Sequence, residues 1–157
     1  MTFLQRFFLI GIAGVCLSAF AGCSSPDYSR TNESTVFSKE ENEEIMRLRI
    51  NGDEFQVKLE QNQTAEKLRM ILPKKIRMHD LHQNEKYYDL PQSLPTNATR
   101  VGKIEAGDVM LYGDDTLVIF YQSFDTNFSY TRIGRIVEMQ KLAERFGINE
   151  IQIERSN

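Results

Sequence analysis

AGDVMLYGDDTLVIFYQSF, residues 106–124, contains two apolar segments separated by a Gly-Asp-Asp turn. Residues 107–112 and 116–122 are each long enough for a strand, and Gly and Asp are typical of the tight turn between antiparallel strands. The second segment is apolar at successive positions, so both of its faces should be buried. We therefore expect residues 116–122 to form a central strand.

Shorter strand patterns lie on both sides of this pair. Residues 46–51 and 55–59 alternate apolar and polar side chains around Asn51-Gly52-Asp53, which is typical of a β-hairpin. The segment 91–102 contains two prolines and a glycine and is predicted to be a loop. Further strands are predicted at residues 75–81, 86–90, 130–137 and 151–155.

Two segments have the periodicity of a helix. Residues 64–72 place apolar side chains on one helical stripe and end before Pro73, and residues 139–146 do the same before Gly147. About eight short strands with only two short helices favour a mainly β protein built as a closed β-barrel, because closure removes the exposed edges of the sheet. We expect the helices to cover the barrel ends and the ring of Phe120 to lie inside.

The N-terminal segment has the features of an export signal. FFLIGIAGVCLSAF, residues 7–20, carries no charge and as a helix would span roughly 21 Å, short of the ~30 Å hydrocarbon core of a membrane. Ala21 and Gly22 then lead into Cys23. This arrangement resembles the lipobox of bacterial lipoproteins, which implies a signal peptide at residues 1–22 and lipidation of Cys23. The alternative is an ordinary signal peptide followed by a chance cysteine.

The next segment is polar and acidic, and it predicts a flexible tether at residues 23–45 followed by a folded domain at residues 46–157. A short helix at residues 37–45 is the alternative, because Glu and Lys are good helix formers. The only other cysteine is Cys16, inside the expected signal, so no disulfide is expected in the domain.

Charge and motifs exclude several kinds of function. The net charge of −3 at pH 7 gives no reason to expect binding to nucleic acid, so membrane contact should come from the lipid on Cys23. His79 and His82 would face opposite sides of a strand and should not bind a metal together. Asp114 and Asp115 are explained by their turn. No cofactor motif is present, and we expect neither a cofactor nor a metal.

The order of these segments resembles that of the bacterial cyclophilin-like family. The resemblance rests on the first hairpin, TAEKLRMILP, NEKYYDLPQSLPTN, AGDVMLYGDDTLVIFYQSF and YTRIGRI, and extends over about residues 46–155. It implies the cyclophilin-like barrel. The resemblance of residues 21–23 to a lipobox separately implies a lipid anchor in the bacterial cell envelope, with the domain outside the cytoplasm.

Cyclophilins isomerise X-Pro bonds with an Arg in a Phe-His-Arg stretch on the strand after the first helix. That strand here reads KKIRMHD, so Arg77 is the nearest candidate, but Phe-His does not precede it. KYYDL stands where those enzymes carry Gln-Gly-Gly. We therefore expect no catalytic residues, and a peptidyl-prolyl isomerase of low activity is the alternative.

Aromatic residues are dense in the second half of the chain, and tyrosine combines an apolar ring with a polar tip, which suits a groove for a peptide. We select Tyr121, Phe124, Tyr130 and Arg132 as candidate ligand-binding residues, because the end of one strand and the loop at residues 122–129 should bring them to one barrel rim. The ligand would be a peptide or an envelope protein. The competing interpretation is that these aromatic residues only fill and surround the barrel.

Overall fold

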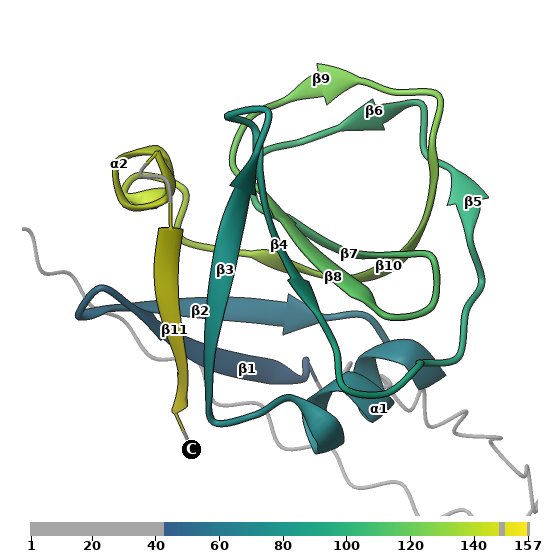
Figure 1. Ribbon diagram of the computed structural model, residues 1–157, viewed down its shortest axis with the longest axis horizontal. Coiled ribbons are helices and arrows are strands. Elements are labelled where there is room, and N and C mark those ends of the chain that lie inside the picture. The colour runs from purple at the N-terminus through teal and green to yellow at the C-terminus, as the bar shows by residue number, and fades with distance from the viewer. Residues whose placement is uncertain (1–42, 148–149, 157) are drawn as a thin grey trace, which may run out of the picture. The chain divides into compact units, whose positions relative to one another are not determined.

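The computed structural model describes residues 43–147 and 150–156, which form eleven strands and two helices (Figure 1). The elements, in chain order, are β1 (Ile45–Ile50), β2 (Asp53–Leu59), α1 (Gln63–Ile71), β3 (Lys75–Leu81), β4 (Glu85–Asp89), β5 (Thr99–Arg100), β6 (Lys103–Ile104), β7 (Asp108–Tyr112), β8 (Thr116–Phe120), β9 (Phe124–Asp125), β10 (Ser129–Ile136), α2 (Leu142–Phe146) and β11 (Glu150–Ser156).

Eight antiparallel strands form a closed barrel, which confirms the expected fold class. Their order around the barrel is β2-β1-β11-β3-β4-β8-β7-β10, and pairing of β10 with β2 closes it. The strand β8 pairs with β4 and β7, so residues 116–120 are central, as predicted. The expected hairpin is also present, with Asn51 and Gly52 at positive φ in the two-residue turn between β1 and β2.

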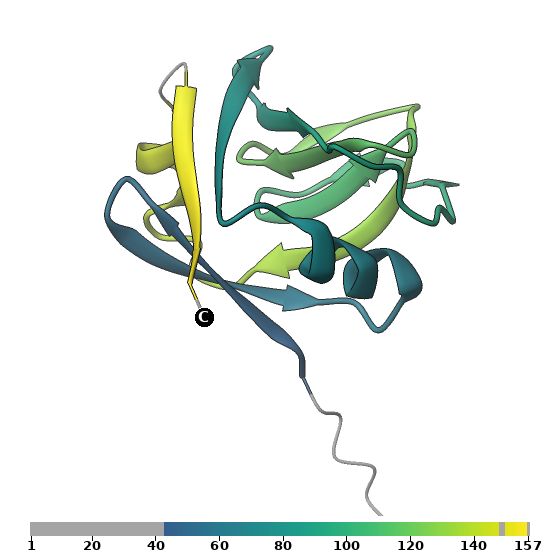
Figure 2. The same cartoon turned by 60° about the horizontal axis from the view of Figure 1, so that its bottom comes forward.

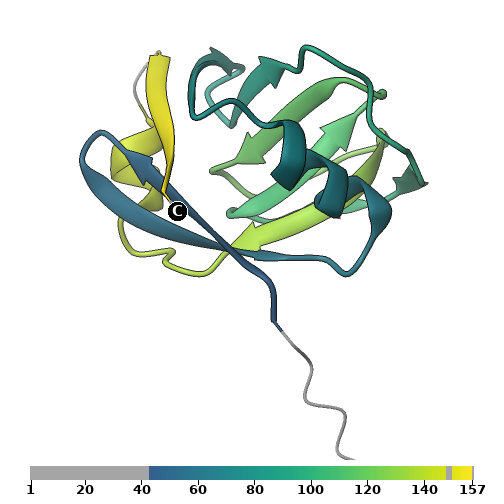
Figure 3. The ribbon, with the colours of Figure 1, turned by 90° about the horizontal axis from the view of Figure 1, so that it is seen from below.

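One apolar cluster fills the barrel, and both helices contribute to it. Ala65 and Leu68 of α1 and Leu142 and Phe146 of α2 are buried in the same cluster as the inward side chains of the strands. Figures 2 and 3 show the two helices on opposite sides of the barrel. The second helix is shorter than predicted, because it begins at Leu142 and leaves Met139 partly buried in the segment before it.

A second, smaller cluster lies outside the barrel, against the outer face of β7, β8 and β10. It contains Ile104, Met110, Val118, Phe120 and Tyr130. Phe120 is fully buried, but in this outer cluster, so the expectation that its ring lies inside the barrel is wrong. Side chains alternate along β8, and Leu117 and Ile119 take the inward positions.

The outer cluster is covered by short strands that the sequence pattern did not predict. The expected loop at residues 91–102 contains β5, and the expected loop at residues 122–129 contains β9, which pairs with β6. Each of these strands has two residues, which is too few for an alternating pattern to be recognised. In Figure 1, β6 and β9 lie across from β7, β8 and β10.

The chain joins the barrel a little before the predicted domain boundary. Glu44 accepts a backbone hydrogen bond from Leu59 at 2.8 Å and pairs with Arg69 at 2.7 Å, and β1 begins at Ile45. Residues 43–45 are not helical. The expected signal peptide, Cys23 and the tether up to residue 42 lie outside the described residues. Within residues 43–147 and 150–156, neither helix is long and apolar enough to cross a membrane.

Candidate functional site

A cavity of about 690 Å³ lies on the outer face of the barrel, beside the second apolar cluster. This volume is within the range of ~300–1,000 Å³ that is typical of small-ligand sites. The strands β3, β4, β7, β8, β9 and β10 contribute to it, together with the adjoining loops. Its lining residues are Leu81, His82, Asn84, Glu85, Tyr87, Asp89, Tyr112, Thr116, Val118, Phe124, Asp125, Thr126, Asn127, Phe128 and Tyr130.

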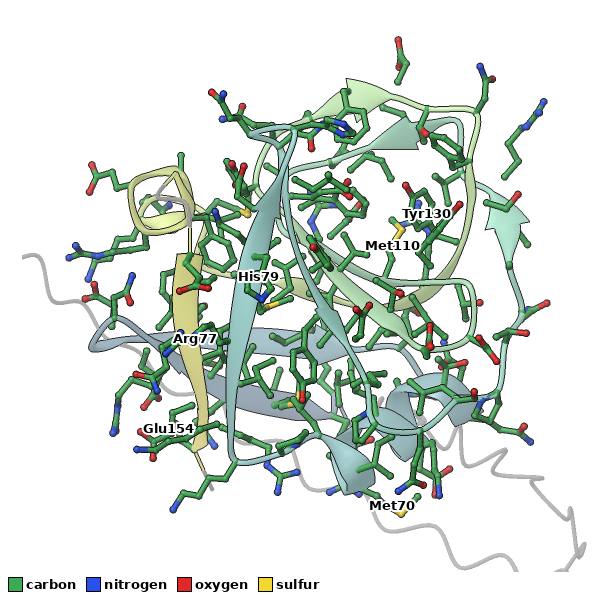
Figure 4. The ribbon with its side chains drawn as sticks, viewed as in Figure 1. Met70, Arg77, His79, Met110, Tyr130 and Glu154 are labelled. Atoms are coloured by element: carbon green, nitrogen blue, oxygen red, sulfur yellow. The ribbon has the colours of Figure 1, made fainter. Side chains whose placement is uncertain are left out.

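A continuous row of aromatic rings runs along this cavity. Phe128 contacts Tyr112 at 6.1 Å between ring centroids, and Tyr112 contacts Tyr130 at 5.6 Å. The ring of Phe120 contacts Tyr130 at 5.4 Å and Phe124 at 5.7 Å between centroids, so it connects these two rings. Figure 4 shows Tyr130 with Met110 in the space between the barrel strands and the β6–β9 pair. Three of these contacts are edge-to-face and the one between Tyr112 and Tyr130 is tilted; together they hold the rings in place, so the aromatic surface is preorganised.

The mouth of the cavity exposes apolar side chains to solvent. Leu81, Tyr112 and Phe128 are three of the five large hydrophobic residues that the described part of the chain leaves exposed, and all three line this cavity. Phe128 is 61% exposed. A cluster of exposed apolar side chains around a cavity is typical of a binding site, because such a surface is otherwise unfavourable in water.

A strained turn forms one side of the mouth. His82 and Gln83, between β3 and β4, both have positive φ, at 54° and 57°, although neither is glycine. Asp80 stabilises the turn by accepting a hydrogen bond from the Gln83 backbone at 3.0 Å. Asn84 follows, and its buried Oδ1 has no hydrogen-bond partner among the described residues. The turn therefore places His82 at the mouth, and the unsatisfied oxygen of Asn84 lies buried below the surface.

Burial shifts the pKa of two ionisable groups of the cavity. Glu85 is half-buried, and this burial raises its pKa above the ordinary value of 4.5, with the charge of Asp80 adding to the increase and that of His82 opposing it. Burial also raises the pKa of Tyr130 to about 12, and the nearby charge of Glu85 contributes. Because burial disfavours the ionised form of Glu85, a positively charged neighbour would stabilise it.

The structure brings together only two of the four predicted site residues. Phe124 and Tyr130 both line the cavity. Tyr121 is buried inside the barrel, where its ring contacts Phe146. Arg132 lines a different, polar cavity of about 440 Å³ next to α1, and its Nη1 lies 3.8 Å from Asp108. Successive residues of a strand face opposite sides, so Phe120 and Tyr121 could not both reach one site.

Tyr121 belongs to a buried ionic network under the turn. Its hydroxyl donates to Asp80 Oδ1 at 2.6 Å, and the Lys86 ammonium donates to the same oxygen at 2.6 Å. The Lys86 side chain has 0% exposure, and its Nζ lies 5.1 Å from the centre of the Tyr121 ring. The network therefore supports the turn from inside and leaves no part of Lys86 accessible to a ligand.

Arg77, the nearest equivalent of the isomerase arginine, lies away from the cavity. Its side chain is 69% exposed, and Nη1 pairs with Glu150 on the neighbouring strand at 3.5 Å. His79 pairs with the same carboxylate at 3.1 Å, and Figure 4 shows both residues beside β3 and β11. His82 instead lines the cavity, so the two histidines do not form a joint site. Within the described residues, no group of three His, Cys, Asp or Glu could hold a metal ion.

Sequence reasoning missed several residues of the cavity. The carboxylates of Glu85, Asp89 and Asp125 and the exposed Leu81 were not expected there. Tyr112 and Phe128 belong to the aromatic-rich half of the chain, and that density was the only available signal. The lining residues come from six strands and the loops beside them, so no spacing within one strand could identify them together.

Comparison with known proteins agrees with this fold. A model of the cyclophilin-like family matches residues 48–154. Among solved structures, the solution structure of the hypothetical protein AF2241 from Archaeoglobus fulgidus is similar, with a TM-score of 0.53 and 18% sequence identity. That similarity covers 73% of this chain and 94% of AF2241, and it extends to the fold alone. No curated protein matches the chain.

Proposed function

The chain belongs to the cyclophilin-like family, and from this premise we propose that its domain is a non-catalytic module that binds an extended peptide or a protein segment. The single observation that carries the proposal is the cavity with Leu81, Tyr112 and Phe128 exposed at its mouth. Phe124 and Tyr130 would form its aromatic wall. Rigid aromatic rings supply a large contact area at a low entropic cost, which suits the capture of a peptide.

The composition of the cavity favours binding over isomerisation. Rotation about an X-Pro bond has a barrier of ~18–20 kcal/mol, and an enzyme lowers it with donors that bind the twisted amide more strongly than the planar one. No Arg or Lys is among the described residues that line this cavity, and Arg77 is paired on another part of the barrel. A cavity that binds the peptide equally well with a planar or a twisted X-Pro bond raises the affinity without raising the rate of isomerisation.

Phe128→Ala is expected to weaken peptide binding about tenfold, because it removes an exposed ring from the mouth of the cavity. The measurement is affinity for peptides selected from a random phage-displayed library with the full-length chain, purified in mild detergent, as bait. Met70→Ala is the matched control, because Met70 on α1 is also 61% exposed but does not line the cavity. Both variants should keep the melting temperature of the unaltered chain.

Two results would contradict this function. If the selected peptides bind Phe128→Ala as tightly as Met70→Ala, the cavity is not the peptide site. If the protein accelerates isomerisation of X-Pro tetrapeptides and Arg77→Ala removes that rate, the alternative of a weak prolyl isomerase is correct. A parallel Arg132→Ala variant tests the polar cavity beside α1, where Asn62, Thr64 and Thr131 already use their side chains in local hydrogen bonds.

We further propose that the module is carried on the bacterial cell envelope by a lipid on Cys23. The support is the uncharged segment at residues 7–20 followed by Ala21, Gly22 and Cys23. A polar segment of about 22 residues then precedes β1 and as a flexible coil would separate the domain from the membrane by roughly 25 Å. The cavity would thus be available to a peptide outside the cytoplasm.

Cys23→Ser is expected to abolish labelling by a radioactive or clickable fatty acid, because serine offers no thiol for the acyl chain. It should also move most of the protein from the membrane fraction to the soluble fraction, since the lipid supplies the membrane affinity. Cys16→Ser serves as the matched control, because that cysteine lies within the expected signal. Unchanged acyl labelling and membrane retention in Cys23→Ser would overturn the lipid anchor.

A further inference from the structure

Carboxylates outnumber basic side chains in the cavity, and His82 is the one basic group among the described lining residues. Glu85, Asp89 and Asp125 all line it, and Lys and Arg are absent from the described lining residues. None of the three carboxylates forms an ion pair with another described residue. Among the described residues, the Asp89 carboxylate accepts a single hydrogen bond, from the Thr116 hydroxyl at 3.1 Å. The cavity therefore offers three carboxylates whose charge is not neutralised within the described part of the protein.

The uncharged groups of the lining favour the same kind of ligand. The faces of aromatic rings carry a negative potential and attract cations that lie over them. The aromatic row from Phe128 through Tyr112 to Tyr130 provides such rings at the same site.

A bare metal ion does not fit this arrangement. A divalent cation needs several oxygen ligands at about 2.0–2.6 Å from one point. No three acidic or histidine side chains within residues 43–147 and 150–156 converge in this way. The carboxylates instead lie at separate positions around a cavity of about 690 Å³. The ligand should therefore be an extended organic cation that reaches several acceptors and also contacts the rings.

We propose that the cavity binds an arginine side chain within an extended peptide, with the guanidinium between the aromatic row and the carboxylates of Glu85 and Asp125. This inference rests on the proposed function and names the chemistry of its ligand. The peptide on either side of the arginine would contact Leu81, Tyr112 and Phe128 at the mouth. Prolyl peptides without a basic residue would be poor ligands.

Arginine fits better than lysine for a geometric reason. The guanidinium is planar, so it stacks on an aromatic face while its five N–H donors remain directed outward in the plane. These donors remain available to a carboxylate while the plane of the guanidinium stacks on a ring. The lysine ammonium is a compact and strongly hydrated charge with three donors, so it gains less from stacking.

The test uses the full-length chain in mild detergent and four peptides, acetyl-Ala-Ala-Xaa-Ala-Ala-amide with Xaa as arginine, lysine, citrulline or glutamate. Citrulline keeps the shape of arginine and removes the charge. Calorimetric titration should give an affinity for the arginine peptide about tenfold above that for citrulline, with lysine between them. Glutamate should bind least. Acetyl-arginine-amide alone should bind more weakly than the peptide, because it lacks the flanking backbone.

The protein variants identify the site. Glu85→Gln removes a charge with almost no change of shape and should reduce the preference for arginine over citrulline about tenfold. Glu54→Gln is the matched control, because Glu54 lies on β2 outside the cavity, where it pairs with Arg47 at 3.7 Å. Asp125→Asn is a second variant on the exposed side of the cavity, in case the half-buried position of Glu85 does not tolerate the change.

Each result has a defined meaning. Equal affinities for arginine and citrulline, or stronger binding of the glutamate peptide, would overturn the arginine inference but leave the peptide-binding function intact. The arginine inference would also be overturned, with the peptide-binding function intact, if library-selected neutral peptides bind at this cavity and the arginine peptide does not. If neither the arginine peptide nor any library peptide binds, both the inference and the proposed function fail. A preference for arginine that survives both Glu85→Gln and Asp125→Asn would place the site elsewhere.

Discussion

Gly134→Ala is expected to destabilise the protein by about 3 kcal/mol, because the added methyl group would occupy the seam that closes the barrel. A Cβ at this position would collide with the Lys58 carbonyl oxygen and would lie 3.1 Å from Val57 Cγ1. Both contacts are on β2, which pairs with β10 at this point. Backbone atoms of a paired strand cannot move aside without breaking the pairing, so equilibrium urea unfolding should show the loss directly.

The reason for this sensitivity is the path of β10. Its register with β7 shifts between Arg132 and Gly134, and the strand then pairs with β2 from Gly134 to Ile136. Such a bulge bends the strand, and at Gly134 and Arg135 it pairs with β7 on one side and with β2 on the other. The glycine is therefore required by the close approach of two backbones at the bend.

Gly113→Ala is the matched control for this substitution. Gly113 lies in the turn between β7 and β8 at a φ of +61°, and a Cβ there would meet no atom within 4 Å. Its substitution should cost only about 1 kcal/mol, the conformational penalty of a left-handed backbone for a residue with a side chain. A smaller loss for Gly134→Ala than for Gly113→Ala would show that the seam adapts, contrary to this prediction.

Asp80→Asn is the second change expected to have a large effect, a loss of about 3–5 kcal/mol in the free energy of unfolding. The asparagine keeps the shape of the side chain but no longer neutralises the ammonium of Lys86, whose side chain is completely buried. The same oxygen of Asp80 also accepts the Tyr121 hydroxyl, so two of its contacts weaken together. A loss of this size is a large part of the stability of a typical domain.

Lys86→Met provides the comparison that separates charge from packing. Methionine fills a similar volume without a charge, and Asp80 keeps its bonds to Tyr121 and to the Gln83 backbone. We expect this variant to lose less stability than Asp80→Asn, and the double variant to lose less than the sum of the two. Strictly additive losses in urea unfolding would show that the two charges do not interact in the folded protein.

The same network should contribute to stability against acid. Burial alone would raise the pKa of Asp80, but the hydrogen bonds from Lys86, Tyr121 and Gln83 outweigh it, and the pKa lies below its ordinary value of 3.8. A lowered pKa adds stability above the unfolded value, and this stability disappears as the pH falls through the folded value. Asp80→Asn should therefore reduce the decline in stability that the unaltered protein shows below about pH 4.

Local patterns in the sequence were sufficient to predict the elements of the barrel. Alternation at residues 46–59, helical spacing at residues 64–72 and the apolar pair at residues 107–122 each depend on neighbours along the chain, and all three were confirmed. The two-residue strands β5, β6 and β9 were not predicted, because their form depends on pairing with distant segments. Closure at Gly134 likewise depends on β2, which lies more than seventy residues earlier.

The candidate site was only partly predictable from the sequence. Residues at β8 and β4 show which features could not be predicted. The apolar segment at residues 116–122 indicated two buried faces, but only the structure assigned Phe120 to the outer cluster and Tyr121 to the barrel interior. In the same way, a lysine at position 86 would be expected at the surface from sequence alone, but the structure buries it in an ion pair with Asp80.

The sequence by itself therefore determined which segments become strands and helices, since these follow from the period of the side chains. The number of short strands further indicated a closed barrel, because closure removes exposed sheet edges. Only the tertiary structure decided which face carries the cavity and which charges surround it. The physical reason is that a binding surface is assembled from side chains brought together by strand pairing, and a pattern along one strand does not specify what lies across from it.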